Sequence, residues 1–172
     1  MQQLYLTGPH APQLAEKLFT ALNVRPAGYQ LLPVSVGGGV RAEALHLLVP
    51  PAAPMENDVP CRIRLRPGDW TVVPRVLDEI AAPNLRRLLD LRRPILLGGL
   101  TAQMLTCTAF REAVVTVLLS PLPVIVAAED DAEELLRALT PEDAQLWMPV
   151  PDSSEGRSAL LEELIAEAAM RL

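Results

Sequence analysis

The chain has 172 residues, of which 50% are hydrophobic and 21% charged, and its 15 basic and 21 acidic residues give a net charge of −6. This composition excludes intrinsic disorder and argues against a nucleic-acid binder, which carries a basic surface. The longest apolar runs fall well short of the ~20 residues that span a bilayer, so we expect no membrane segment. The length suits one domain, and we expect residues 1–172 to form it.

Short apolar runs bounded by Gly and Pro alternate with segments of helical period along the chain. The apolar runs predict strands, in chain order, at 3–7, 30–36, 40–49, 61–65, 94–97, 122–128 and 145–149. The helical periods predict helices at 11–22, 71–89, 110–119, 130–139 and 155–172. Three glycines at 37–39 predict a hairpin turn, and the proline-rich stretch 50–60 predicts an exposed loop. We expect 61–65 at a sheet edge, and a capping box formed by Asp130 and Glu133.

Wholly apolar strands that alternate with helices are typical of a parallel sheet covered on both faces. We therefore expect an α/β fold in three layers with a mostly parallel sheet, to which an inserted β-hairpin adds an antiparallel element. The runs Leu4–Leu6, Ile95–Leu97 and Val124–Val126 have no polar alternation. They are predicted to be the central strands, buried on both faces.

The strand, tight loop and helix at the start of the chain have the layout of a phosphate-binding P-loop, whose motif is G-x-x-x-x-G-K-[ST]. Gly8 matches the first glycine of that motif. Gln13 stands where the second glycine belongs, Leu14 where the lysine belongs, and Ala15 where the hydroxyl belongs.

Small matches in the same order and spacing extend over nearly the whole chain. They are Ala27–Gln30 (a G-F segment), Leu77–Pro83 (a proline-containing helix), Ile95–Thr101 (where D-E-I-G would stand), Phe110–Val114 (the following helix) and Gly156–Arg157 (an N-R pair). In these features the chain resembles the small P-loop nucleoside-triphosphatase family of thermophilic bacteria and archaea, which also has a human cancer-related member.

The resemblance implies a P-loop NTPase-like fold and, in working members, hydrolysis of a Mg-nucleotide. Leu14 and Ala15 replace the groups that hold phosphate and Mg²⁺, and Gly98 and Gly99 replace the two acids that support the metal and orient water. We therefore expect a degenerate pseudoenzyme, a bacterial cytoplasmic protein that binds or interacts without hydrolysis and needs no cofactor. The alternative is a nucleoside triphosphatase that still binds and hydrolyses a Mg-nucleotide with non-standard residues.

The candidate binding residues are those of the degenerate phosphate loop: Gly8, His10, Gln13, Leu14 and Ala15. Because Pro9 and Pro12 lack N–H donors, we expect a loop of similar path that is narrowed or filled, with Leu14 packed toward the sheet. Lys17 lies one helical turn beyond the normal lysine position and replaces it only if the helix start is shifted. Restoring Gln13→Gly, Leu14→Lys, Ala15→Thr and Gly98→Asp together is expected to return some nucleotide affinity.

Other residue groups point to structure more than to chemistry. Cys61, Cys107, His10 and His46 lack metal-type spacing, so no metal site is predicted, and the two cysteines fit a reducing cytoplasm better than a disulfide. The acidic run 129–134 is interpreted as charge at a helix N-terminus. A protein partner and a weakly bound nucleotide both stay open, whereas nucleic acid and membrane are not expected.

Overall fold

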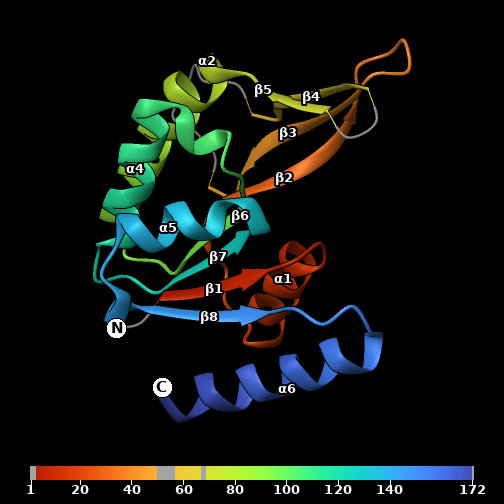
Figure 1. Cartoon of the computed structure of the whole chain (residues 1–172). Coiled ribbons are helices and arrows are strands. Elements are labelled where there is room, and N and C mark those ends of the chain that lie inside the picture. Colours follow the sequence, from red (N-terminus) through yellow and green to blue (C-terminus); the bar gives the residue numbers. More distant parts are fainter. Residues whose placement is uncertain (1–2, 50–56, 67–68, 172) are drawn as a thin grey trace.

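The computed structural model describes residues 3–49, 57–66 and 69–171, and its strands form one eight-stranded sheet in the order β5-β4-β3-β2-β6-β7-β1-β8 (Figure 1). The strands are β1 (Gln3–Thr7), β2 (Ala27–Ser35), β3 (Arg41–Leu47), β4 (Val59–Arg66), β5 (Asp69–Val72), β6 (Ile95–Leu100), β7 (Val124–Ala128) and β8 (Gln145–Pro149). The α-helices are α1 (Ala11–Ala21), α2 (Pro74–Val76), α3 (Ala82–Leu88), α4 (Thr108–Leu118), α5 (Glu133–Leu139) and α6 (Ser154–Arg171).

The sheet is parallel in its larger part and antiparallel at one end. Strands β2, β6, β7, β1 and β8 are joined by parallel ladders, and β2, β3, β4 and β5 by antiparallel ones. The predicted α/β class with a mostly parallel sheet is thus confirmed, and β1, β6 and β7 lie inside the sheet as expected. The expected hairpin is one part of a larger antiparallel element, and we call its strands β3, β4 and β5 the arm.

Two predictions about the arm are wrong. The segment predicted as an edge strand, 61–65, lies in β4 between β3 and β5. The reason is that Asp69–Val72, placed partly in a helix by its apolar spacing, forms the edge strand β5. Pro74 then begins α2, where its missing N–H costs nothing. Most of the proline-rich stretch 50–60 falls outside the described residues, and its last two residues belong to β4.

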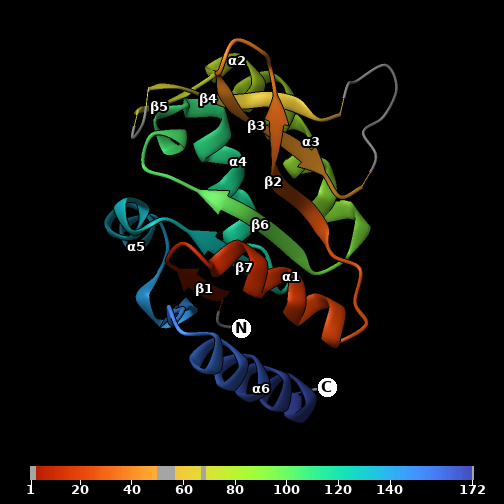
Figure 2. The same cartoon turned by 90° about the vertical axis from the view of Figure 1, so that its right-hand side faces the viewer.

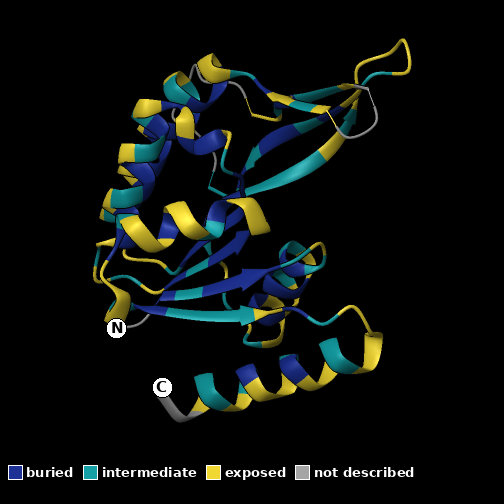
Figure 3. Cartoon of the chain, viewed as in Figure 1, coloured by how far each residue is buried: buried dark blue, intermediate teal, exposed yellow. Residues whose placement is uncertain are grey.

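Helices cover both faces of the sheet, which completes the three expected layers (Figure 2). Helices α1 and α6 pack on one face, and α3, α4 and α5 pack on the other. Successive side chains of a strand point to opposite faces, so neighbouring strand residues belong to different cores. The first face buries Leu6, Leu14, Leu18, Leu96 and Leu164, and the second buries Tyr5, Tyr29, Leu85, Leu97 and Phe110. Figure 3 shows buried residues along the central strands and exposed ones on the outer sides of the helices. No helix in the described part of the chain is long and apolar enough to cross a membrane.

The helix predicted at 71–89 is interrupted by a π-helical turn over Leu77–Ala81. Pro83 follows that turn and has no N–H to donate to the preceding turn, so the helical hydrogen-bond pattern changes there. Asp78 in the π turn accepts a hydrogen bond of 3.0 Å from the backbone N–H of Phe110, in the first turn of α4. The two helical segments are thereby joined by a cap that sequence spacing did not predict.

Candidate functional site

The loop after β1 is a tight turn of only three residues. Gly8 has a φ of 105°, which favours glycine, and His10 is the N-cap of α1. The amide of Ala11 donates to the carbonyl of Gly8 at 3.2 Å, and that of Leu14 donates to the carbonyl of His10 at 3.1 Å. In a P-loop the helix follows the G-K-[ST] positions, and the preceding amides surround an anion. Here the helix starts earlier, and two of those amides are hydrogen-bonded within the chain.

The five predicted loop residues do not converge on one point. Gly8 lines a pocket at the ends of the central strands, which we call the inner pocket. His10, Gln13 and Leu14 line a second pocket between α1 and α6, which we call the outer pocket. Ala15 is fully buried. Leu14 is 3% exposed and packs in the core beside the sheet, as predicted.

The inner pocket has a volume of about 170 Å³ and lies where β1, β6 and β7 end. Ligands of open α/β sheets bind at the carboxyl ends of the parallel strands, which is this position. The pocket is lined by Gly8, Pro9 and Pro12 of the loop, by Gly98 and Gly99 of β6, by Ala127, Ala128 and Glu129 at the end of β7, and by Leu31, Glu43 and Arg62. The loop and the two glycines that replace the expected acids therefore do meet in one pocket.

Arg62 is the cationic residue of the inner pocket. Its Nε donates to Oε2 of Glu43 at 2.9 Å, and its Nη1 donates to Oε1 of Glu129 at 3.0 Å. Its guanidinium carbon lies 4.4 Å from the ring centroid of Trp70. The side chain is only 9% exposed. Burial lowers the pKa of Arg62, but the two carboxylates outweigh it and raise the pKa above its usual value, so the residue stays charged.

Sequence reasoning missed this ion-pair network because its members come from three distant segments. Glu43 lies on β3, Arg62 on β4, and Glu129 directly after β7. The acidic run does lie at helix N-termini, as interpreted: Glu129 precedes a 3₁₀ turn that contains Asp130 and Asp131, and α5 follows with Glu133 and Glu134 in its first turn. The pairing of the Glu129 carboxylate with Arg62 was not predicted. The predicted capping box is wrong, because Asp130 opens the 3₁₀ turn and α5 has no side-chain cap. No local pattern in the sequence signals such a tertiary network.

The electrostatics of the inner pocket are unfavourable for phosphate. Two carboxylates against one guanidinium leave a formal charge of −1 on its lining side chains. Both Glu43 and Glu129 hold Arg62, so a phosphate would have to displace a carboxylate to reach it. Each such charged hydrogen bond is worth about 1.5–3 kcal/mol.

The two glycines of β6 allow close approach of neighbouring strands. A Cβ atom at Gly98 would lie 2.5 Å from the backbone carbonyl oxygen of Tyr29 on β2. A Cβ atom at Gly99 would meet the end of the Leu31 side chain at 2.6 Å, and the Tyr29 hydroxyl donates to the carbonyl of Gly99 at 2.7 Å. Gly98 is therefore required by the backbone geometry, and an acidic side chain does not fit there.

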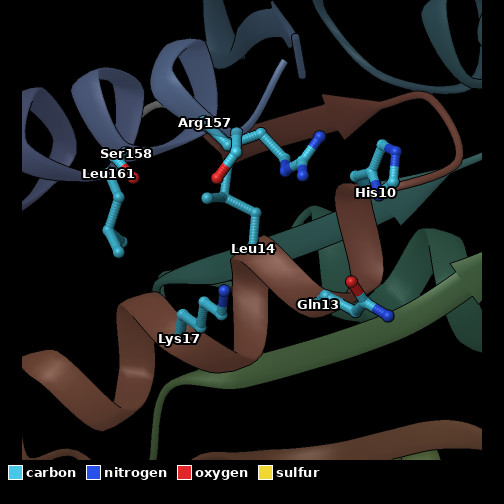
Figure 4. Close-up of a pocket in the computed structure, with 8 residues that line it drawn as sticks. His10, Gln13, Leu14, Lys17, Arg157, Ser158 and Leu161 are labelled. Atoms are coloured by element: carbon cyan, nitrogen blue, oxygen red, sulfur yellow. The ribbon is translucent and has the colours of Figure 1, made fainter. Parts of the chain in front are cut away.

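The outer pocket is smaller, about 60 Å³, and lies between two helices (Figure 4). Helix α1 and its N-cap contribute His10, Gln13, Leu14 and Lys17, and α6 contributes Ser154, Arg157, Ser158 and Leu161. Because α1 starts at Ala11, Lys17 lines this pocket and not the inner one. It therefore does not take the place of the P-loop lysine.

The cysteines and histidines form no further centre within the described residues. No group of three or more His, Cys, Asp or Glu side chains there is placed to hold a metal. Cys61 and Cys107 are free and buried. Burial raises the pKa of Cys61 to about 12 and raises that of Cys107, so both thiols are protonated near neutral pH. His46 contacts Asp58, with 2.6 Å between Nδ1 and Oδ1, on the outside of the arm.

The three layers and the mostly parallel eight-stranded sheet match a P-loop NTPase-like fold, whereas the loop after β1 departs from a P-loop. No family model matches the chain, and no curated protein sequence is significantly similar to it. Among solved structures, the chain is similar to the crystal structure of THEP1 from the hyperthermophile Aquifex aeolicus, with a TM-score of 0.70 and 16% sequence identity. The match covers 96% of this chain and 98% of THEP1. At this identity the likeness shows the fold alone.

Proposed function

We propose that the protein is a non-hydrolysing relative of the P-loop nucleoside triphosphatases, a cytoplasmic pseudoenzyme that acts by binding a partner. The observation that carries this proposal is the early start of α1. The amides of Ala11 and Leu14, which an open loop would present to a phosphate, are bonded to Gly8 and His10. Pro9 and Pro12 contribute no amide donors at all. The loop therefore lacks the ring of donors that binds nucleotide phosphates.

The chemistry of phosphoryl transfer supports the same proposal. The reaction depends on positioned cations and a metal that neutralise the developing charge. In the inner pocket the positive charge of Arg62 is already neutralised by Glu43 and Glu129. Gly98 leaves no room for the acid that would support Mg²⁺. No nucleotide cofactor is needed in this function, and a protein partner is the expected ligand.

Steady-state hydrolysis of ATP and GTP with Mg²⁺ tests the proposal directly. We expect no turnover above the background of a mock purification. An Arg62→Gln variant is assayed in parallel, because it removes the cationic residue of the inner pocket and leaves the loop unchanged. Turnover that co-purifies with the protein and disappears in Arg62→Gln would overturn the proposal.

The alternative, an unusual nucleoside triphosphatase, is favoured by the presence of both a cation and a carboxylate in the inner pocket. Arg62 brings a permanent cation to the position where phosphate would lie, and Glu129 brings a carboxylate that is 51% exposed and able to accept a metal. In that function, a phosphate of the bound Mg-nucleotide replaces Glu129 as the partner of Arg62, and Glu129 is free to bind the metal. Thermal unfolding with Mg-ATP and with Mg²⁺ alone separates the two functions, since only the alternative predicts a nucleotide-dependent rise in Tm that Arg62→Gln abolishes.

A further inference from the structure

The outer pocket collects positive charge in an acidic protein. Lys17 and Arg157 line it from opposite helices, and no carboxylate does, although the chain carries a net charge of −6. Lys17 is also the one lysine in the whole sequence. Gln13, Ser154 and Ser158 add uncharged hydrogen-bond donors. The lining is therefore rich in side-chain donors and contains no carboxylate.

The Lys17 side chain does not contribute to the stability of the fold. Its side chain is exposed, and it makes no ion pair within the described residues. Figure 4 shows it on α1 one turn after Gln13, with Leu14 between it and Arg157. Its ammonium group is thus available to a ligand, and its removal takes nothing from the core.

Arg157 is held in place by backbone carbonyls. Its Nη1 donates to the carbonyl oxygens of Pro151 and Asp152, in the turn that leads into α6. Its Nε and Nη2 have no acceptor among the described residues. The guanidinium is therefore oriented by one nitrogen and offers the remaining donors to the pocket (Figure 4).

The helix ends add to the positive potential. Helix α1 starts beside the pocket and has no acidic residue in its first turn. Helix α6 starts at Ser154, which lines the pocket, whereas the acidic Glu155 of its first turn does not. The N-terminus of each helix carries about half a positive charge. This field acts together with the side-chain charges and in the same direction.

We propose that the outer pocket binds a phosphate group, either inorganic phosphate or a phosphomonoester. Two permanent charges in one pocket match a dianion, and side-chain donors line the pocket from both helices. A volume of about 60 Å³ accommodates one such group and excludes a nucleobase. The site goes beyond the proposed function and does not depend on it, because phosphate is bound here whether or not the inner pocket hydrolyses nucleotides.

The single lysine makes the test specific. Reductive methylation with ¹³C-formaldehyde labels Lys17 and the α-amino group and keeps the positive charge, and the Lys17 signal is assigned by its loss in Lys17→Arg. Titration of the folded protein with inorganic phosphate, at constant ionic strength against chloride, is expected to shift that signal saturably. AMP is expected to produce the same shift and adenosine none, since only the phosphate group is recognised. No saturable shift with phosphate, or an equal shift with adenosine, overturns the proposal.

Calorimetry on variants tests the residues. Lys17→Gln and Arg157→Gln are each expected to weaken phosphate binding about tenfold or more, because each removes a charged hydrogen bond. Arg25→Gln, an exposed arginine beyond the opposite end of α1, is the matched control and is expected to bind like the parent. Lys17→Gln should keep the parent Tm, so its loss of binding is not a loss of folding. Unchanged affinity in Lys17→Gln contradicts the assignment.

Discussion

Arg62 on β4 and Glu129 after β7 are 67 positions apart in the sequence, and a hydrogen bond of 3.0 Å joins their side chains. This bond ties the arm to the carboxyl end of the parallel sheet, directly over the inner pocket. With Glu43 it forms a network of one guanidinium and two carboxylates around a side chain that is 9% exposed. Paired charges from the arm and from the end of β7 therefore line this pocket together.

Replacing Arg62 should destabilise the fold more than replacing its partner Glu129. Arg62→Met leaves two carboxylates facing one another without their cation, and we expect a loss of about 2–3 kcal/mol in the free energy of unfolding. Glu129→Gln keeps a hydrogen-bond acceptor at a half-exposed position and should cost about 1 kcal/mol or less. Urea unfolding measures both. The exposed pair of Arg75 and Glu79 provides the control, and Arg75→Met should change little; equal effects at positions 62 and 75 would contradict this prediction.

Gly98→Ala should destabilise the protein by about 2–3 kcal/mol, because its Cβ would lie 2.5 Å from the Tyr29 carbonyl oxygen, a backbone atom that cannot turn away. Gly99→Ala is the matched comparison. Its contact is the end of the flexible Leu31 side chain, so a cost under about 1 kcal/mol is expected. Thermal or urea unfolding ranks the two variants, and a ranking in the opposite order would show that β2 moves away easily. The four-substitution restoration suggested by the sequence therefore has to omit Gly98→Asp and carry the acid at position 99.

Asp78→Ala should remove the tertiary cap of α4. The carboxylate accepts a hydrogen bond from the Phe110 amide at 3.0 Å, and losing such a cap costs about 1–2 kcal/mol. Glu79→Ala, the neighbouring acid, breaks only an exposed pair with Arg75 and is expected to cost a few tenths, about 0.3–0.5 kcal/mol. Circular dichroism monitored during urea unfolding gives both values. If Glu79→Ala costs as much as Asp78→Ala, the cap contributes nothing.

The buried thiols should make stability fall at alkaline pH. The pKa of Cys61 is raised from 9.0 to about 12 by burial, and that of Cys107 is raised as well. The unfolded chain therefore loses these thiol protons first, so stability is full below about pH 9 and decreases above it. Between pH 8 and 10 we expect a loss of about 1 kcal/mol for Cys61 alone. Cys61→Ala should flatten the pH dependence over this interval, measured by urea unfolding, whatever its effect at pH 7; an unchanged slope would contradict the assignment.

The sequence predicted the fold well where one strand or helix has its own periodicity. The apolar runs in β1, β6 and β7 are buried by helices on both faces, so their pattern alone identified them as central strands. The arm was harder, because Val72 fits the spacing of a helix as well as that of the edge strand β5. Its placement depends on the pairing of Trp70 with Arg64 on β4, which no local pattern encodes.

The candidate site was predictable only in part, for a related reason. The replaced motif residues could be read directly, and Gly8, Gly98 and Gly99 do line one pocket. The charged residues of that pocket could not be found, because Glu43, Arg62 and Glu129 meet through sheet topology and not through spacing. Lys17 and Arg157 likewise line one pocket because α6 packs on α1.

The early start of α1 also lowers the fraction of molecules whose loop after β1 is open to a nucleotide. A nucleotide at the loop after β1 requires a state in which the first turn of α1 is unwound, the amides of Ala11 and Leu14 are released, and Leu14 leaves the core. Two hydrogen bonds and one buried leucine make this open state roughly 3–4 kcal/mol less stable than the closed one. On the order of one molecule in several hundred is then competent to bind, and the apparent affinity is lowered by that factor. New positive charges in the loop would therefore add little nucleotide affinity until the helix itself is made to start later.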